Sequence, residues 1–161
     1  SSFVMGPKGN DELCQKLSEI TGGLPCVTAT TAMVDGLKAV GAKRVAVLSP
    51  HPPEIAEKLK EYLEESGFEI PCLVGLGLDI PRINNTSPGD IYRHVRSMDL
   101  SNADAIFIAA TNFRAIDVIE EIEADIGLPV VSSNQVVMWT ALRKLGIADK
   151  PEGYGRLWDC G

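Results

Sequence analysis

Short apolar runs alternate with amphipathic segments of helical period along almost the whole chain, and this alternation constrains the fold more than any other feature. We predict strands at residues 25–29, 44–48, 68–76, 105–109 and 129–132. Helices are predicted at residues 11–21, 31–40, 52–66, 90–98, 113–126 and 134–145. Strands separated by helices of this length indicate a parallel sheet with helices on both faces. The predicted fold class is therefore α/β.

Length and charge limit the possible partners. The chain has 161 residues, which is typical of one domain, and a net charge of -7. An acidic chain is a poor match for nucleic acid or for an anionic membrane, although a local pocket can still bind a small anion. No apolar run approaches the roughly 20 residues needed to span a bilayer. The sequence leaves open whether the chain forms a homo-oligomer.

The cysteines and histidines do not form a metal-binding pattern. Cys14, Cys26, Cys72 and Cys160 include no C-x-x-C pair, and the histidines are distant from them in sequence. We therefore expect no metal site. Scattered cysteines without a visible signal peptide are typical of reduced thiols, so we expect a cytoplasmic protein. The chain begins at Ser1 without an initiator methionine, and we expect that residues before it were removed or not recorded.

An internal repeat links the two ends of the sequence. Residues 23–28 read Gly-Leu-Pro-Cys-Val-Thr and precede a predicted helix that ends at Gly41. Residues 127–132 read Gly-Leu-Pro-Val-Val-Ser and precede a predicted helix that ends at Gly146. The two prolines are 129 − 25 = 104 residues apart. Glycine followed by proline is common after a helix, but the shared order of elements favours a duplication.

The turn Ala110-Thr111-Asn112 is the leading site candidate because it follows the apolar strand 105–109 directly. A strand that leads into a helix N-terminus leaves backbone N–H groups available to an anion. We predict that these groups, the Thr111 hydroxyl and the Asn112 amide bind a carboxylate. The alternative is an ordinary helix cap, for which Thr and Asn are common residues. The residue at the turn itself is alanine, which carries no reactive group.

Polar residues at the ends of neighbouring strands are expected at the same edge of the sheet. Ser49 and His51 follow strand 44–48, and ligands of open parallel sheets bind at the carboxyl ends of strands. His51 could donate a hydrogen bond to an anion, or it could be a solvated loop histidine. The run 132–135, Ser-Ser-Asn-Gln, can line the site or cap the next helix. Residues 28, 30 and 31, all threonine, are its counterpart in the first repeat.

Several segments together resemble the aspartate/glutamate racemase superfamily, in the branch of maleate cis-trans isomerases and arylmalonate decarboxylases. The first are the Gly-Leu-Pro-Cys start at Gly23, Gly36-Leu-Lys-Ala-Val-Gly41 and Arg44-Val-Ala-Val with Ser49-Pro-His. Ala110-Thr-Asn-Phe-Arg follows. The most specific are Gly127-Leu-Pro-Val-Val-Ser-Ser-Asn-Gln with Trp139, and Gly153-Tyr-Gly-Arg-Leu-Trp158. The resemblance covers essentially the whole chain.

The resemblance implies two similar α/β domains with the active site between them, of which this chain would contain the second. Residues 1–40 would then be the tail of the first domain, residues 41–146 the second domain, and residues 147–161 a segment that returns to the first. The turn of the first domain would lie at or just before Ser1. Ser1 and Ser2 are therefore expected to bind substrate.

The resemblance also implies a chemistry that needs neither a metal nor an organic cofactor. A cysteine is expected at position 110, where this chain has alanine, as either the proton-donating or the nucleophilic thiol of the site. One cysteine of the family site would add to the double bond of a small dicarboxylate such as maleate. Decarboxylation of a substituted malonate is the alternative activity, and a binding protein without catalysis is the third. Cys26 is a tempting nucleophile, but we interpret it as a structural residue of a strand.

Two origins of Ala110 remain open at this stage. One is an engineered cysteine-to-alanine change that stops turnover and keeps a ligand bound, and the other is a natural loss of the thiol. The residues that follow, Thr111 to Arg114, keep the form of the family, which favours the engineered change. In either case we predict that the chain is inactive.

Overall fold

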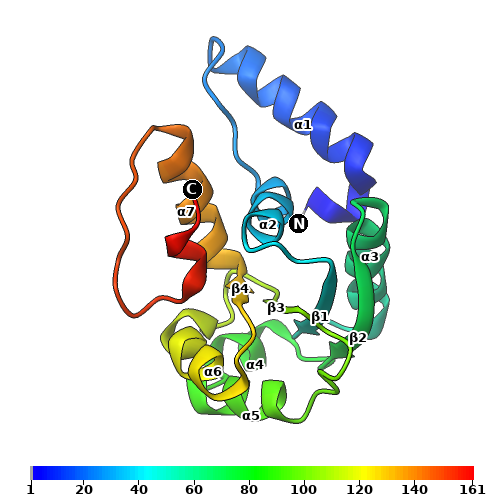
Figure 1. Ribbon diagram of the computed structural model, residues 1–161. Coiled ribbons are helices and arrows are strands. Elements are labelled where there is room, and N and C mark those ends of the chain that lie inside the picture. Colours follow the sequence, from blue (N-terminus) through cyan, green and yellow to red (C-terminus); the bar gives the residue numbers. More distant parts are fainter. Residues whose placement is uncertain (1) are drawn as a thin grey trace.

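A four-stranded parallel sheet forms the centre of the protein (Figure 1). The computed structural model describes residues 2–161. The strands lie in the order β2-β1-β3-β4 and every pairing is parallel. Their bounds are β1 Arg44–Ser49, β2 Glu69–Gly75, β3 Ala105–Ile108 and β4 Val130–Ser132. The predicted α/β class is confirmed.

Seven α-helices and three short 3-10 helices connect and cover the strands of the described part of the chain. The α-helices are α1 Gly6–Ile20, α2 Ala29–Ala39, α3 Pro53–Glu65, α4 Ile80–Asn85, α5 Pro88–Arg96, α6 Ile119–Ile126 and α7 Ser133–Lys144. The 3-10 helices are η1 Ser2–Met5, η2 Ala115–Val118 and η3 Arg156–Asp159. None of the helices within residues 2–161 is long and apolar enough to cross a bilayer.

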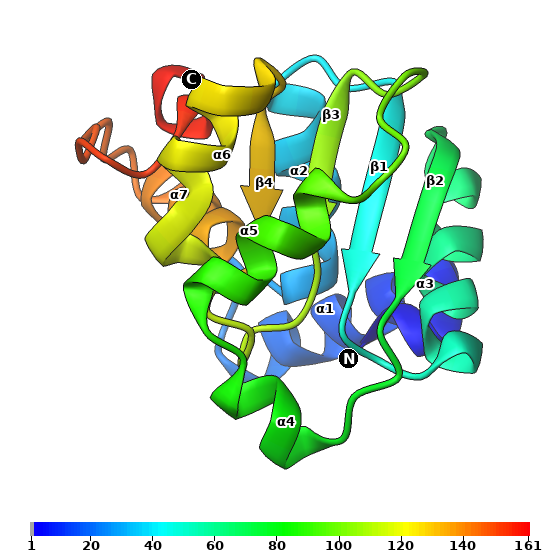
Figure 2. The ribbon, with the colours of Figure 1, turned by 90° about the horizontal axis from the view of Figure 1, so that it is seen from below.

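Alternation along the strands assigns the helices to two layers. Val45 and Val47 of β1 pack into the cluster formed with α2, α3 and α7, whereas Ala46 and Leu48 pack into the cluster formed with α4, α5 and α6 (Figure 2). Successive side chains of a strand point to opposite faces, so a strand that is apolar at every position must be covered on both sides. Helices on both faces of the sheet are the result.

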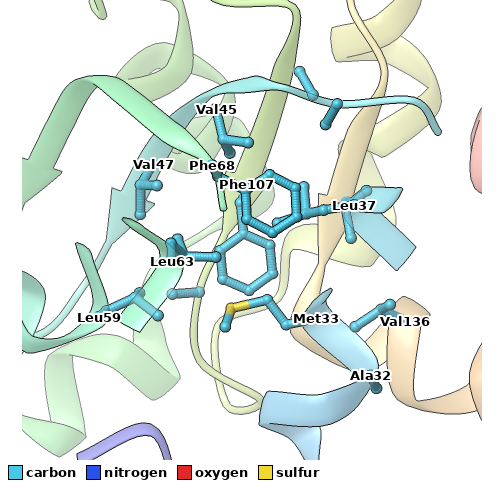
Figure 3. Close-up of a cluster of buried hydrophobic side chains, with 14 of the residues drawn as sticks. Ala32, Met33, Leu37, Val45, Val47, Leu59, Leu63, Phe68, Phe107 and Val136 are labelled. Carbon is cyan, nitrogen blue, oxygen red and sulfur yellow. The ribbon is translucent and has the colours of Figure 1, made fainter. Parts of the chain in front are cut away.

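The cluster on the α2 side is built around Phe107 of β3 (Figure 3). Met33 of α2 and Leu59 of α3 lie close to this ring in Figure 3. All three side chains are at most 2% exposed. These residues also line the cavity described below, so the tightly packed core forms the floor of the site.

Two sequence predictions about this architecture are wrong. No strand forms at residues 25–29, because an extended segment becomes a strand only when a neighbouring strand accepts its hydrogen bonds, and the described sheet offers none there. No helix starts at residue 113 either. A turn at 111–113 leads into η2, and α6 begins only at Ile119.

The remaining differences concern helix starts. Helix α1 begins at Gly6 rather than at residue 11, and Pro7 in its first turn is typical of a helix start. Helix α4 was not predicted. It is only six residues long and starts at the Asp79 cap, where the Asp79 side chain accepts the Arg82 N–H at 2.9 Å.

Candidate active site

The candidate site lies where the direction of strand succession reverses. From β1 the chain first adds β2 on one side and then β3 on the other, so the loops that follow β1 and β3 diverge at their carboxyl ends. Such a switch point is where open parallel sheets bind their ligands. The loop after β1 contains His51, and the loop after β3 contains Ala110.

A cavity of about 280 Å³ opens at this point. It brings together the predicted residues His51, Ala110, Thr111 and Asn112 from both loops. Helices α2 and α7 close it from the side. The other lining residues are Phe3, Ala29, Thr30, Met33, Leu59, Phe107, Ala109 and Ser133.

Ala110 has a backbone conformation that alanine rarely adopts. Its φ angle is 78°, and it is the only non-glycine residue of the described chain with positive φ. A side chain in this left-handed region costs roughly 1–2 kcal/mol, which glycine avoids. Strain of this kind persists where a surrounding structure imposes it, and it is concentrated at functional sites. The position therefore retains a Cβ at an energetic cost, and this Cβ borders the cavity.

The backbone around Ala110 offers donors to a ligand. The turn closes through the Phe113 N–H, which donates to the Ala110 carbonyl at 3.3 Å. Among residues 2–161, no protein atom accepts a hydrogen bond from the N–H groups of Ala110, Thr111 or Asn112. Successive N–H groups around a left-handed residue form a concavity that favours anions. This turn, rather than the helix dipole assumed from the sequence, supplies the positive end, because α6 begins nine residues after Ala110.

The side chain of Asn112 is already engaged. Its Nδ2 donates to the Asn84 Oδ1 at 2.8 Å, which joins the turn to α4. Thr111 is exposed, and its carbonyl accepts a hydrogen bond from Asn134 Nδ2 at 2.8 Å. The turn is thus held from both sides, by α4 and by the start of α7.

Ser49 and His51 differ in their access to the cavity. Ser49 is 0% exposed, is absent from the lining, and its Oγ accepts the His51 N–H at 3.4 Å. It therefore shapes the loop. His51 borders both the cavity and a groove of about 690 Å³ that leads to Leu78, Ile80 and Ile83. Burial lowers the pKa of His51, so its imidazole is neutral at pH 7 and can donate one hydrogen bond.

The first repeat contributes a hydroxyl network on the α2 side of the cavity. Ser2 Oγ lies 2.7 Å from Thr30 Oγ1 and 2.7 Å from Asn10 Oδ1. Asn10 is 1% exposed, and its Nδ2 donates to Thr31 Oγ1 at 2.9 Å. Thr30 is 1% exposed and lines the cavity. Ser1, the other predicted residue of this segment, lies outside the described residues.

A capping box places Ser133 at the cavity. The Ser132 Oγ accepts the Gln135 N–H, and the Gln135 Oε1 accepts the Ser132 N–H at 3.2 Å. The amide of Gln135 also donates to the Tyr154 carbonyl at 2.5 Å. Of the run 132–135, Ser133 lines the cavity, whereas Ser132 and Gln135 form the cap.

A buried carboxylate attaches the C-terminal segment to the sheet. Glu123 is 5% exposed and accepts the N–H groups of Val130 at 2.7 Å and Arg156 at 2.9 Å. Burial raises the pKa of Glu123, while these two N–H groups oppose the shift. Gly155 allows the close approach, because a Cβ there would collide with Ile119. The Gly153–Trp158 segment, called the C-terminal clasp below, is therefore attached to β4 through Glu123 and has a structural role.

The cysteines and acidic residues do not form a second reactive centre. All four cysteines are unpaired, and Cys26 is half-buried beside the Leu24 carbonyl, outside the cavity lining. Among residues 2–161, no three His, Cys, Asp or Glu side chains are grouped to hold a metal. No local pattern marks Phe3, Asn10 or Asn84 as part of the site, because their roles depend on contacts between distant segments.

The fold and the site together define a class: a parallel α/β protein with a turn of unpaired backbone N–H groups at the carboxyl end of the inner strand β3. Residues 1–158 match the family described as arylmalonate decarboxylase. The chain therefore belongs to this family. It is 33% identical over 164 residues to the arylmalonate decarboxylase of Bordetella bronchiseptica. The aligned region covers 98% of this chain and 67% of that protein.

Solved structures of maleate isomerases have the same fold. One is a cysteine-to-alanine variant of the maleate isomerase Iso from Pseudomonas putida S16, solved with maleate. It matches with a TM-score of 0.95 and 26% sequence identity, and the match covers 99% of this chain and 66% of the isomerase chain. A cysteine-to-serine variant of the Nocardia farcinica maleate cis-trans isomerase with a covalently bound succinylcysteine intermediate has a TM-score of 0.91 and 30% identity, over 98% and 66%. The chain thus spans about two thirds of the length of these relatives.

Proposed function

We propose that this chain carries the dicarboxylate-binding site of a cofactor-independent, cysteine-dependent isomerase of the maleate isomerase type, with Ala110 at the position of the reactive thiol. The observation that carries the proposal is the left-handed backbone of Ala110 at the mouth of the cavity. A stability requirement alone would select glycine there, so a side chain at this position has a reason other than folding.

The turn is suited to a carboxylate. The unpaired N–H groups of Ala110, Thr111 and Asn112 can donate hydrogen bonds to a carboxylate. The low-dielectric floor of Met33, Leu59 and Phe107 strengthens such bonds. His51 and Thr30 lie on the other walls of the cavity. The second carboxylate of a four-carbon diacid bound at the turn could contact them.

A thiol at position 110 would complete the chemistry. Its thiolate would be favoured by the same N–H groups, which lower a thiol pKa. It would add to one alkene carbon of maleate, forming a C–S bond and a carbanionic enediolate that the N–H groups stabilise. Rotation about the former double bond and expulsion of the thiolate would give fumarate. The succinylcysteine in the Nocardia farcinica structure shows that a cysteine of that protein forms a covalent adduct, and this cysteine is not the one replaced by serine in that variant. With a methyl group at Ala110, the chain binds but does not turn over.

Arylmalonate decarboxylation is the second candidate, and one observation favours it. The groove beside His51 is lined by Leu78, Ile80 and Ile83 and connects to the site through His51 and Asn112. It could accept an apolar substituent, which maleate does not have. In that reaction the carboxylate would leave as carbon dioxide, and a thiol at position 110 would protonate the resulting enediolate.

Binding and turnover test these alternatives. Maleate and phenylmalonate are titrated separately into the chain, and backbone amide shifts are followed by NMR; we expect changes centred on residues 109–112 and His51. Ala110→Cys is then assayed for fumarate formation from maleate and for carbon dioxide release from phenylmalonate. Fumarate supports the isomerase, carbon dioxide supports the lyase, and tight binding without turnover supports a non-catalytic protein. Shifts that avoid the turn entirely would refute the site.

A further inference from the structure

The second residue of α2 and the second residue of α7 occupy equivalent positions, and each makes a side-chain hydrogen bond to a distant segment. Thr30 and Asn134 are 134 − 30 = 104 residues apart, the spacing of the internal repeat. Their N-caps, Thr28 and Ser132, have the same spacing and cap in the same way, each accepting the N–H three residues on. Thr30 contacts Ser2, and Asn134 contacts Thr111. Each helix thus uses the same position to bind a segment that contributes to the cavity, η1 for α2 and the turn 110–112 for α7.

The contact made by Asn134 determines how one peptide group is oriented. Asn134 Nδ2 donates to the Thr111 carbonyl at 2.8 Å. The peptide bond between Thr111 and Asn112 is trans and planar, so its N–H points away from its C=O. Fixing the carbonyl toward α7 therefore directs the Asn112 N–H away from α7. No atom of residues 2–161 accepts this N–H.

We propose that Asn134 is a positioning residue, which orients the Asn112 N–H toward a ligand carboxylate without touching the ligand itself. This inference rests on the proposed dicarboxylate site. Two observations separate the role from that of a lining residue. Asn134 is exposed and is not part of the cavity lining, whereas its neighbour Ser133 is. Its only side-chain bond within the described chain is the one to Thr111.

Asn134→Asp is the most informative variant. A carboxylate in the first turn of α7 favours the helix dipole, so the helix itself is not weakened. The same carboxylate cannot donate to the Thr111 carbonyl and repels it. A role confined to helix α7 would leave this variant unaffected or stabilised, whereas a positioning role predicts a loss of binding. Asn134→Thr restores a side-chain hydrogen-bond donor without a charge and is expected to recover part of the affinity.

Two readouts keep the test decisive. Calorimetric titration with maleate is expected to show about five- to tenfold weaker binding for Asn134→Asp, the effect of losing one oriented donor. The ¹³C shift of the Thr111 carbonyl is expected to move upfield because its hydrogen bond is lost. Asn102→Asp is the matched control, since Asn102 lies in an exposed loop and bonds only Ser101.

The outcomes separate the two claims. If the wild-type chain binds no dicarboxylate, the proposed function fails, and the carbonyl shift still decides whether Asn134 orients the peptide. An unchanged Thr111 carbonyl in Asn134→Asp overturns the inference. Unchanged maleate affinity in a variant whose carbonyl has moved overturns it as well, as does an equal loss of affinity in Asn102→Asp.

Discussion

The two Gly-Leu-Pro repeats begin with the same local signals and reach different structures. Both lead into a helix through a hydroxyl N-cap, Thr28 for α2 and Ser132 for α7. The second repeat forms strand β4 because β3 lies beside it, whereas residues 25–29 of the first have no neighbouring strand in the described sheet. Local pattern sets the helix and its cap, but a strand exists only as part of a pair.

A buried polar side chain secures the corner of each repeat. In the first, Asn10 of α1 bonds Thr28 and Thr31. In the second, Glu123 of α6 bonds Val130 and connects it to Arg156. The first corner is neutral and built from hydroxyl groups, and the second uses a charge and backbone donors. Since bonds to charged groups are the stronger ones, we expect the second corner to contribute more to stability.

The largest expected effect follows from removing the carboxylate of the second corner. Glu123→Ala leaves the buried Val130 N–H and the partly buried Arg156 N–H without an acceptor, so we expect a loss of about 3 kcal/mol in the free energy of unfolding. Urea denaturation measures this loss. Glu121→Ala on the exposed side of α6 is the matched control and should change little. A loss in Glu123→Ala no larger than that of the control would contradict the structural role of the C-terminal clasp.

The first corner is tested in the same way. Asn10→Ala removes the amide that joins α1 to Thr28 and Thr31, and we expect a loss of about 2 kcal/mol, smaller than for Glu123→Ala. Asp11→Ala, which is exposed, serves as the control. If Asn10→Ala proved the more destabilising of the two variants, the ranking of the neutral and the charged corner would be reversed.

A third prediction concerns the strain beside the second repeat. Ala110→Gly relieves the positive φ angle, so we expect a gain of about 1 kcal/mol, or roughly 2–4 °C in Tm. Ala109→Gly, one residue earlier and buried, has no such strain to relieve and should destabilise the chain. Calorimetry of both variants distinguishes local strain from a general effect of glycine, and an Ala110→Gly variant that melts earlier than the wild type would argue against strain.

The smallest expected effect is the pH dependence contributed by His51. Burial lowers its pKa below that of the unfolded chain, so the unfolded state binds more protons between the two values. Stability should therefore rise with pH through this window up to about 6.5 and be lost as pH falls through it. His51→Gln should flatten the slope. An identical slope in wild type and His51→Gln would exclude this contribution.

Much of the fold was predictable from local signals. Strands β1 and β3 are apolar at successive positions, which required cover on both faces, and helices α3, α5 and α7 lie within a residue or two of their predicted bounds. The wrong predictions concern segments 25–29 and 113–118, where the pattern was ambiguous and contacts with distant residues decided the outcome. Helix α4 was too short to show a period.

The sequence by itself determined the parallel α/β class, the polar strand ends and the absence of a thiol from position 110. Periodicity and composition depend on neighbours a few residues away, so they can be read along the chain. Only the tertiary structure decided that Ala110 is left-handed, that Ser49 faces inward while His51 borders the cavity, and that Asn134 holds Thr111. These features arise where β1, β3, α4 and α7 contact one another. A hydrogen bond or a φ angle that depends on contacts between distant segments leaves no pattern in the nearby sequence.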